Sequence, residues 1–387
     1  MRSKSFFSLG TYLLAGFFNL LYSQQLPVLD LATAMDHPSK IALSDFIEDI
    51  TYLRLETTPE CLINRNPEVI LLKDYIIIRT SQKCLLFDRK SGAFLRELGL
   101  YGKGPGEFRS TYGFFDETSS IYYFIGWNGN FLKYSLDGKF LSSLDIPSYS
   151  GTLENPSMPD RYTYLNSNLI LCNFMNINGL ENKSLMIFDT KGKIIKTIPN
   201  RHIIKNVKTS INTGTTSFHH FNNSTFFQEF YNDTVFMIST EKTTPYFILN
   251  RGKYRPPYEA LWWDFEKRKN IMYQPIYLEG AKYLTFEFYY VFGNSPHFFA
   301  IYDKTSKSLK VSENVSGIKN DIDGFMDLTF KSINASGELS CLIQSQDMIK
   351  WFDNNKDKSK SLKPELQALR NINLSDNPIL VIANYKR

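Results

Sequence analysis

The stretch LLFDRKSGAFLREL (85–98) sets out a plan that the chain repeats. An alternating apolar strand ends in an aromatic residue, a turn carries Asp and Gly, and a second strand follows. Two close copies and one weaker copy come later, at LKYSLDGKFLSSL (132–144), MIFDTKGKIIKTI (186–198) and FFAIYDKTSKSLKV (298–311). A β-hairpin that recurs in this way is typical of a β-propeller, in which four-stranded sheets pack around an axis.

The aromatic residue before the turn marks each repeat. It falls at Phe87, Tyr134, Phe188, Phe236 and Tyr302, at steps of 47 to 66 residues. Propeller repeats usually span about 40–50 residues, so the last step requires an insertion. Six blades fit the length best, and five or seven remain as alternatives. We therefore predict an all-β, six-bladed β-propeller of four-stranded blades.

The ends of the chain are expected to close the ring, because an open array would leave two sheet edges unpaired. The early strand ITYLRLE (50–56) is predicted to complete the blade that holds the terminal NPILVIANYK (377–386). The propeller would then fill residues 41–387 as one domain, preceded by a linker at 24–40. Helical spacing predicts short inserts near 256–270 and 362–372.

The first 23 residues have the pattern of a cleaved export signal. Arg2 and Lys4 precede a mainly apolar run at 6–22, and Ser23 supplies a small residue at its end. The alternative is a membrane anchor, but polar residues interrupt the run and it is short for a span. We expect an exported protein, periplasmic or extracellular, without a transmembrane span after cleavage of the signal.

Composition excludes several classes of protein. The chain is 43% hydrophobic and 15% aromatic, which is too apolar for a disordered protein. The net charge is only +5, and the longest basic cluster, 267–269, is typical of a solvated surface. We therefore expect no nucleic-acid partner.

The four cysteines form no closely spaced pair that would hold a metal. Cys61 and Cys84 are the nearest pair should a disulfide form, a question that the sequence leaves open. Cys172 and Cys341 lie in strand-like runs and are expected to be buried thiols.

LYGKGPGEF (100–108), together with YLRLETT (52–58) and DNPILVIANYK (376–386), carries a resemblance to a known family. The chain resembles the six-bladed, NHL-like propellers of secreted and lipid-anchored proteins from Bacteroides-type bacteria. The resemblance implies the fold and export, and it implies no particular reaction. Many relatives carry a lipid-attachment Cys after the signal, and its absence here argues against a lipid anchor.

The glycine-rich segment is the first candidate for a ligand site. It should connect the outer strand of one blade to the inner strand of the next, beside the mouth of the central channel. There Lys103, Glu107 and Arg109 could line a binding site. The competing interpretation is a structural crossover, with Glu107 accepting hydrogen bonds from the backbone or from an Arg, because Gly and Pro are above all turn residues.

Trp262 and Trp263 are the second candidate. Exposed aromatic rings of an exported protein can stack on sugars or anchor a protein partner. The competing interpretation is that one ring packs the insert onto the propeller.

No metal site or cofactor is expected. His219 and His220 are adjacent on a predicted strand and should point to opposite faces. NDIDGFMD (320–327) resembles a calcium loop only superficially, since it lacks the distal Glu at the required spacing. The sequence contains neither the GxSxG nor the HExxH motif.

These observations favour a non-enzymatic binding or scaffold module whose channel-mouth loops hold a glycan, a peptide or an envelope protein. The alternative is a carbohydrate-active hydrolase or lyase that uses charged residues at the central channel. A third hypothesis is a sensor or an assembly component at the outer membrane.

Overall fold

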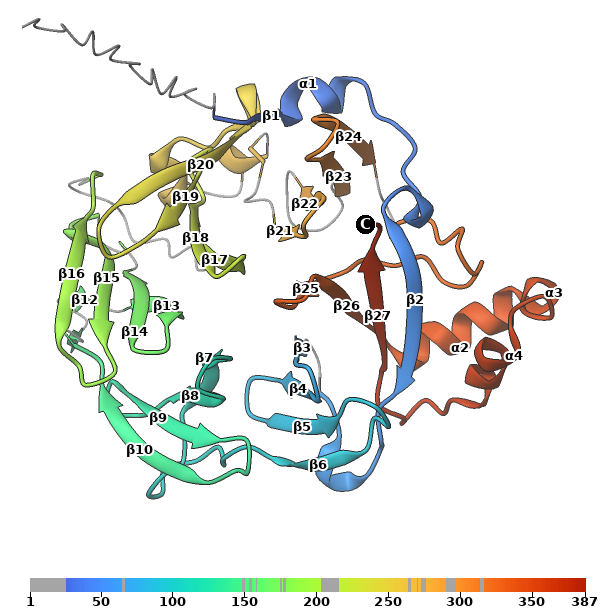
Figure 1. Ribbon diagram of the computed structural model, residues 1–387, viewed down its shortest axis with the longest axis horizontal. Coiled ribbons are helices and arrows are strands. Elements are labelled where there is room, and N and C mark those ends of the chain that lie inside the picture. Colours follow the sequence, from blue (N-terminus) through green and yellow to red (C-terminus); the bar gives the residue numbers. More distant parts are fainter. Residues whose placement is uncertain are drawn as a thin grey trace, which may run out of the picture.

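The computed structural model describes residues 26–387, apart from 65–66, 148–149, 153–154, 158, 175, 177–178, 203–215, 264–265, 270, 273–275, 290–296 and 314–316. Six antiparallel sheets stand around a central axis (Figure 1). Their strands alternate buried and exposed side chains or are buried on both faces, as strands of packed sheets do. The prediction of a six-bladed propeller is confirmed.

Each of the first three blades is an uninterrupted meander of four strands that runs from the channel to the rim. In blade 1 these are β3 (Glu68–Leu71), β4 (Tyr75–Arg79), β5 (Cys84–Asp88) and β6 (Phe94–Glu97). Blade 2 contains β7 (Ser110–Asp116), β8 (Ile121–Ile125), β9 (Asn130–Ser135) and β10 (Phe140–Asp145). Blade 3 contains β13 (Pro159–Asn166), β14 (Leu169–Phe174), β15 (Lys183–Asp189) and β16 (Ile194–Pro199), and it follows a hairpin of β11 (Ser150–Thr152) and β12 (Asn155–Ser157).

Blades 4 and 6 recruit a further segment from the N-terminal part of the chain, whereas blade 5 is again a plain meander of four strands. Blade 4 contains β17 (Thr216–Phe221), β18 (Ser224–Glu229), β19 (Thr234–Ile238) and β20 (Thr243–Asn250), with β1 (Val28–Asp30) added in parallel at its outer edge. Blade 5 contains β21 (Ile276–Glu279), β22 (Tyr283–Tyr289), β23 (His297–Asp303) and β24 (Ser308–Glu313). Blade 6 contains β25 (Ser332–Ile333), β26 (Glu338–Ile343), β27 (Ile379–Tyr385) and, as its outer strand, β2 (Ile47–Arg54).

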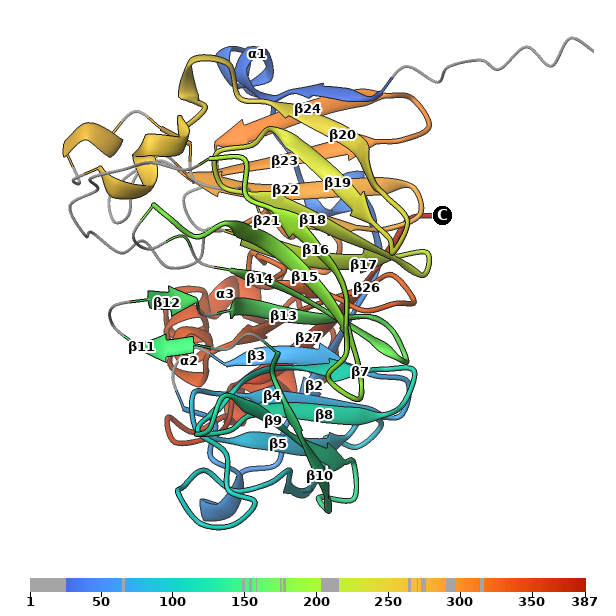
Figure 2. The same ribbon diagram turned by 90° about the vertical axis from the view of Figure 1, so that its left-hand side faces the viewer.

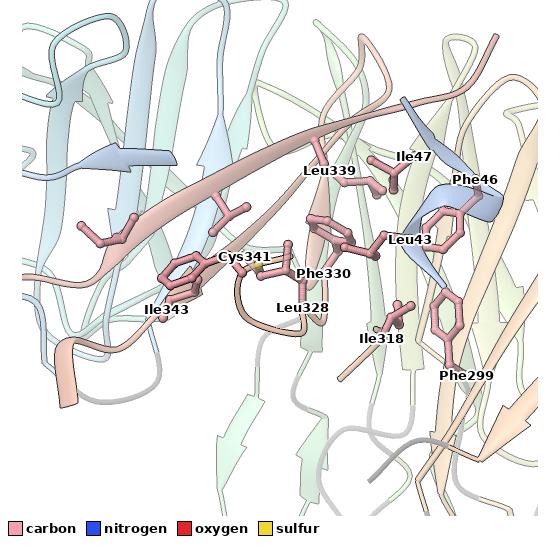
Figure 3. Packing of buried hydrophobic residues seen from close by; sticks show 14 of the residues in the cluster. Leu43, Phe46, Ile47, Phe299, Ile318, Leu328, Phe330, Leu339, Cys341 and Ile343 are labelled. Carbon is pink, nitrogen blue, oxygen red and sulfur yellow. The ribbon is translucent and has the colours of Figure 1, made fainter. Parts of the chain in front are cut away.

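The two ends of the chain close the ring as predicted. β2 pairs antiparallel with β27, with Thr51 opposite Ile382 and Leu53 opposite Leu380. Residues just before and within β2 enter the same core as the last blade: Figure 3 shows Phe46 and Ile47 among buried side chains of blades 5 and 6. Phe46 is fully buried, so closure also removes apolar surface from water.

The segment expected to be a linker, 24–40, carries structure of its own in its described part, which begins at residue 26. β1 is followed directly by α1 (Leu31–Asp36), and the Asp30 carboxylate caps this helix by accepting from the Thr33 N–H. Leu29 and Leu31 are buried in the core between blades 4 and 5. These apolar side chains hold the segment on the outer edge of blade 4, which explains why it is not a free linker.

Short helices fill the remaining connections. The insert expected at 256–270 contains two 3-10 turns instead of one helix, because the extended backbone of Trp263 ends the first turn. In Figure 2 the gold turns of this insert project from the same face as β11 and β12. The helical elements are η1 (Leu43–Asp45), η2 (Pro59–Cys61), η3 (Gly252–Tyr254), η4 (Tyr258–Trp262), η5 (Glu266–Arg268), α2 (Ser345–Asn354), α3 (Lys356–Ser359), α4 (Pro364–Gln367) and η6 (Ala368–Asn371).

All four cysteines are unpaired and buried. Cys61 and Cys84 therefore form no disulfide. Burial raises the pKa of the Cys172 thiol well above its ordinary value, so this side chain behaves as a small apolar core residue.

The Asp-Gly turns that recur in the sequence are the places where neighbouring blades touch. Gly92, Gly138 and Gly192 all have positive φ, and each faces the backbone carbonyl at the end of the previous blade's outer strand. The contact is closest at Gly92, where an added Cβ would lie 2.0 Å from the Arg54 oxygen. Glycine is required there both for its conformation and for the close approach.

We predict that Gly92→Ala lowers the free energy of unfolding by about 3 kcal/mol, because left-handed strain and a steric clash add together. Gly337→Ala is the matched control, since Gly337 also has positive φ (84°) but nothing lies within 4 Å of its added Cβ. The control should lose only about 1 kcal/mol. Urea denaturation of both variants measures the difference, and equal losses would show that the contact between blades 6 and 1 is unimportant.

Candidate functional site

The glycine-rich segment is held in shape by Glu107. The carboxylate of Glu107 accepts a hydrogen bond of 2.7 Å from the Gly104 N–H, and an added Cβ on Gly102 would lie 2.0 Å from the same oxygen. The carboxylate therefore fills the space that the missing side chains leave. Glu107 has the structural role that the competing interpretation gave it, and its Oε2 is committed to the loop.

Residues 102–106 of the loop lie over the outer half of blade 2, not beside the channel mouth as expected, whereas Arg109 directly precedes the innermost strand β7. The Tyr134 hydroxyl on β9 donates to the Gly106 carbonyl at 2.5 Å, and the Phe140 ring on β10 also approaches Gly106. The Glu97 carbonyl at the end of β6 faces Gly138 in the turn between β9 and β10, so the chain leaves blade 1 beside the outer strands of blade 2. The chain starts from the rim and must cross the outer strands before it reaches β7.

Trp127, in the turn between β8 and β9, completes this surface. Its indole N–H donates to the Gly102 carbonyl at 2.5 Å, and the Lys103 ammonium lies 5.2 Å from the ring centroid. The residues Leu100, Tyr101 and Trp127 are 59%, 46% and 43% exposed. We call Leu100, Tyr101, Lys103 and Trp127 the loop platform.

Sequence reasoning identified Lys103 but missed Trp127, which lies outside the repeated hairpin. The one available signal was an aromatic residue in a Gly-Trp-Asn-Gly turn, where a large apolar side chain has no core to enter. Arg109 is half-buried at the start of β7, and its backbone N–H donates to the Ile125 carbonyl.

The two tryptophans of the insert lie elsewhere. Trp263 is half-buried against Phe230, Ala260 and Ile271, so it packs the insert onto the propeller. The side chain of Trp262 is outside the described part of the structure. The insert joins β20 to β21, across the ring from β6 and β7 (Figure 1), so these residues and the loop platform form separate surfaces.

His219 and His220 point to opposite faces of β17, as expected. The His219 ring faces blade 5 and contacts the Glu279 carboxylate at 3.2 Å. The His220 ring faces blade 3, where it hydrogen-bonds the Thr163 hydroxyl at 2.7 Å and stacks on Tyr164. The pair therefore joins blade 4 to both of its neighbours and cannot share a metal.

Glu279 is the centre of a buried network between blades 4 and 5. Tyr246 and Lys304 both donate to one of its oxygens at 2.6 Å, while His219 contacts the other. Burial by itself raises the pKa of Glu279, but these partners outweigh it and leave the pKa below its ordinary value. The Glu279 side chain has no exposed surface, so the network acts as a clamp between blades and cannot reach a substrate.

The acidic segment at 320–327 ties β2 to the last blade. Asp321 accepts hydrogen bonds from Ser44, and Asp323 accepts one from the Tyr52 hydroxyl at 2.9 Å. These carboxylates are occupied by protein donors, unlike those of a calcium loop. Within the described residues, no group of three or more His, Cys, Asp or Glu side chains is placed to hold a metal ion.

We predict that acid destabilises the protein through His220. Burial lowers the pKa of His220 to about 4, below the value of about 6.5 in an unfolded chain. The unfolded state therefore gains a proton first, and stability present above pH 6.5 is lost as the pH falls toward 4. The loss from this residue should reach at most about 3 kcal/mol.

Urea denaturation between pH 7 and pH 4.5 measures this dependence. His220→Gln should be less stable than the natural protein at pH 7 and should show a flatter pH dependence. The exposed His37, changed to Gln, is the control and should leave the slope unaltered. A wild-type slope in His220→Gln would contradict the assignment.

One solved structure has the same overall fold. A presumed exported protein of Bacteroides fragilis has a similar crystal structure, with a TM-score of 0.68 and 16% sequence identity over 94% of this chain and 100% of that one. BamB of Moraxella catarrhalis is less similar, with a TM-score of 0.39 and 11% identity over 75% of each chain. No curated protein sequence matches the chain.

In the part of the chain that the structure describes, no helix has the length and apolar character needed to cross a membrane. The family model of a domain of unknown function, DUF4934, matches residues 26–384. This range begins just before β1 and includes all six blades, so the match covers the closed ring and not a fragment of it. The protein belongs to the DUF4934 family.

Proposed function

We propose that the protein is an exported, non-enzymatic binding module that holds a carbohydrate on the loop platform. The supporting observation is Trp127, a residue that is 43% exposed and whose indole is fixed by the hydrogen bond to Gly102. A ring that is already oriented loses little conformational entropy when a ligand stacks on it. The neighbouring Tyr101 ring and Lys103 ammonium add a second apolar face and a hydrogen-bond donor.

The chemistry of the platform suits a sugar. The C–H face of a pyranose can cover an indole ring while its hydroxyls reach polar groups at the edge. A peptide or an envelope protein could use the same aromatic residues, and the test below separates these ligands. The frame under the platform is rigid, since Glu107 and Tyr134 both bind loop backbone.

Export is the second part of the proposal. It is supported by the charged and apolar pattern of residues 1–23 and by the name of the structurally similar Bacteroides fragilis protein. A protein released from the cytoplasm would meet glycans of the envelope or of the surroundings.

A hydrolase or lyase has less support. Such an enzyme requires carboxyl groups that reach the scissile bond. Glu279, the central carboxylate of the buried network between blades 4 and 5, is enclosed between these two blades. We therefore place the ligand on the platform and propose no reaction.

We predict that a glycan array binds the mature protein and that Trp127→Ala weakens the binding at least tenfold. Loss of one stacked ring, worth about 1.4 kcal/mol, gives this factor. Trp127→Phe, which keeps an aromatic face but loses the N–H donor to Gly102, should retain part of the affinity. Leu374→Ala, a change at a residue that is 70% exposed outside the platform, should bind like the natural protein.

Two outcomes would contradict the proposal. One is an array with no bound glycan while envelope peptides or proteins bind through Trp127. The other is glycan binding that is unchanged in Trp127→Ala, which would place the site elsewhere.

A further inference from the structure

A cavity of about 560 Å³ lies where the ring closes. Its walls come from three segments that are distant in sequence: residues 54–57 at the end of β2, residues 91–93 in the turn between β5 and β6, and residues 372–379 leading into β27. This volume falls within the range of small-molecule sites, about 300–1,000 Å³. The loop platform contributes no residue to it.

The walls are held in place by one buried amide, that of Asn377. Its Nδ2 donates to the carbonyls of Glu56 and Cys61 at 2.6 and 2.9 Å, and its Oδ1 accepts from the Ile63 N–H at 2.9 Å. The Asn377 backbone N–H donates to the Thr57 hydroxyl at 2.9 Å. The close contact of Gly92 with Arg54 fixes the remaining wall. The cavity is therefore preformed, which lowers the cost of binding a ligand.

Charged groups of both signs border the cavity. Arg54 donates one hydrogen bond, from Nη2 to the Ala368 carbonyl, and no carboxylate within the described residues forms an ion pair with it. A guanidinium has five N–H donors, so Arg54 retains donors for an anionic group. Glu56 and Asp376 each use one oxygen to accept a backbone N–H, from Phe94 and Asn373.

The rest of the lining is aliphatic. Leu55, Ile372 and Ile379 are buried and form an apolar wall, and Ala93 leaves room beside it. No aromatic residue lines the cavity, in contrast to the loop platform. A ligand that matches this lining carries a carboxylate, a cationic group and an aliphatic side chain.

We propose that this cavity binds short zwitterionic peptides with aliphatic side chains. The terminal carboxylate pairs with Arg54, the terminal ammonium is held by Glu56 and Asp376, and the side chains contact the aliphatic wall. Charge-assisted hydrogen bonds from a guanidinium to a carboxylate are among the stronger polar contacts in proteins. This site is independent of the proposed carbohydrate site in both position and ligand.

Binding here should stabilise the closed ring. The ligand would contact the outer strand of blade 6, the segment before β27 and a turn of blade 1 at once. Unfolding separates these three segments, so only the folded protein binds. A peptide present well above its dissociation constant must then raise the melting temperature.

The experiment measures calorimetric binding and melting temperature for the mature protein with the dipeptide Leu-Leu at millimolar concentration. We expect saturable binding and a higher melting temperature. N-acetylated and C-amidated Leu-Leu should each bind at least tenfold more weakly, since each has lost one charged end. Trp127→Ala should bind the dipeptide like the natural protein. The dipeptide result therefore does not depend on whether the carbohydrate proposal is correct.

Two variants locate the site. Arg54→Gln should weaken Leu-Leu binding at least tenfold, whereas Arg370→Gln, at an exposed position on η6 outside the lining, should not. Because Arg54 also donates to Ala368, Ala93→Leu provides a second test: it fills the cavity and leaves the Arg54 side chain in place. Absence of any heat or melting shift with Leu-Leu overturns the proposal, as does binding that is unchanged in both Arg54→Gln and Ala93→Leu.

Discussion

The pairing of β2 with β27 is the interaction on which the rest of the structure depends. It joins residues 47–54 to residues 379–385, so nearly the whole chain must be in place before these hydrogen bonds can form. Without it, blade 6 would have three strands, and β27 would present an open edge. The pairing is supported by the buried side chains of Leu43, Phe46 and Ile47, which enter the core of blades 5 and 6. Polar contacts from Asp321 and Asp323 to Ser44 and Tyr52 fix the same segment, so closure is both apolar and specific.

Closure fixes the ring only if each blade also holds its neighbour, and the repeated turns provide that contact. Arg96 of blade 1 donates to the Asp137 carbonyl in the turn of blade 2, and Lys133 of blade 2 donates to the Thr190 carbonyl in the turn of blade 3. Lys196 continues the series from blade 3 to blade 4. Such partly exposed bonds contribute little stability one by one. They lie at the junctions where Gly138 and Gly192 approach the preceding outer strand, and so they add a second contact between successive sheets.

The sequence predicts those features that local periodicity determines. The repeated hairpin predicted the blades, and the two terminal strands predicted the closure, because an alternation of apolar residues can be read from the sequence alone. The sequence could not place the loop platform at the rim, because that position depends on contacts of Gly106 with Tyr134 and Phe140 in the folded blade. The structural role of β1 was hidden for a similar reason: three residues are too few to show a period, and Leu29 is buried only by blades that lie far away in sequence. Trp127 gave no periodic signal because it belongs to a turn.

The loop platform and the cavity at the closure of the ring occupy equivalent places in the ring. One begins where β6 ends and the chain returns toward the axis, and the other begins at the same point after β2. In both, the end of the outer strand is fixed from outside by the glycine turn of the next blade, Gly138 beside Glu97 and Gly92 beside Arg54. A connection with one fixed end can vary in sequence and length without disturbing the sheets that it joins. The junctions between blades are therefore suited to carry binding groups at little cost to stability. The two sites proposed above both lie at such junctions, one lined by aromatic residues and the other by aliphatic and charged residues.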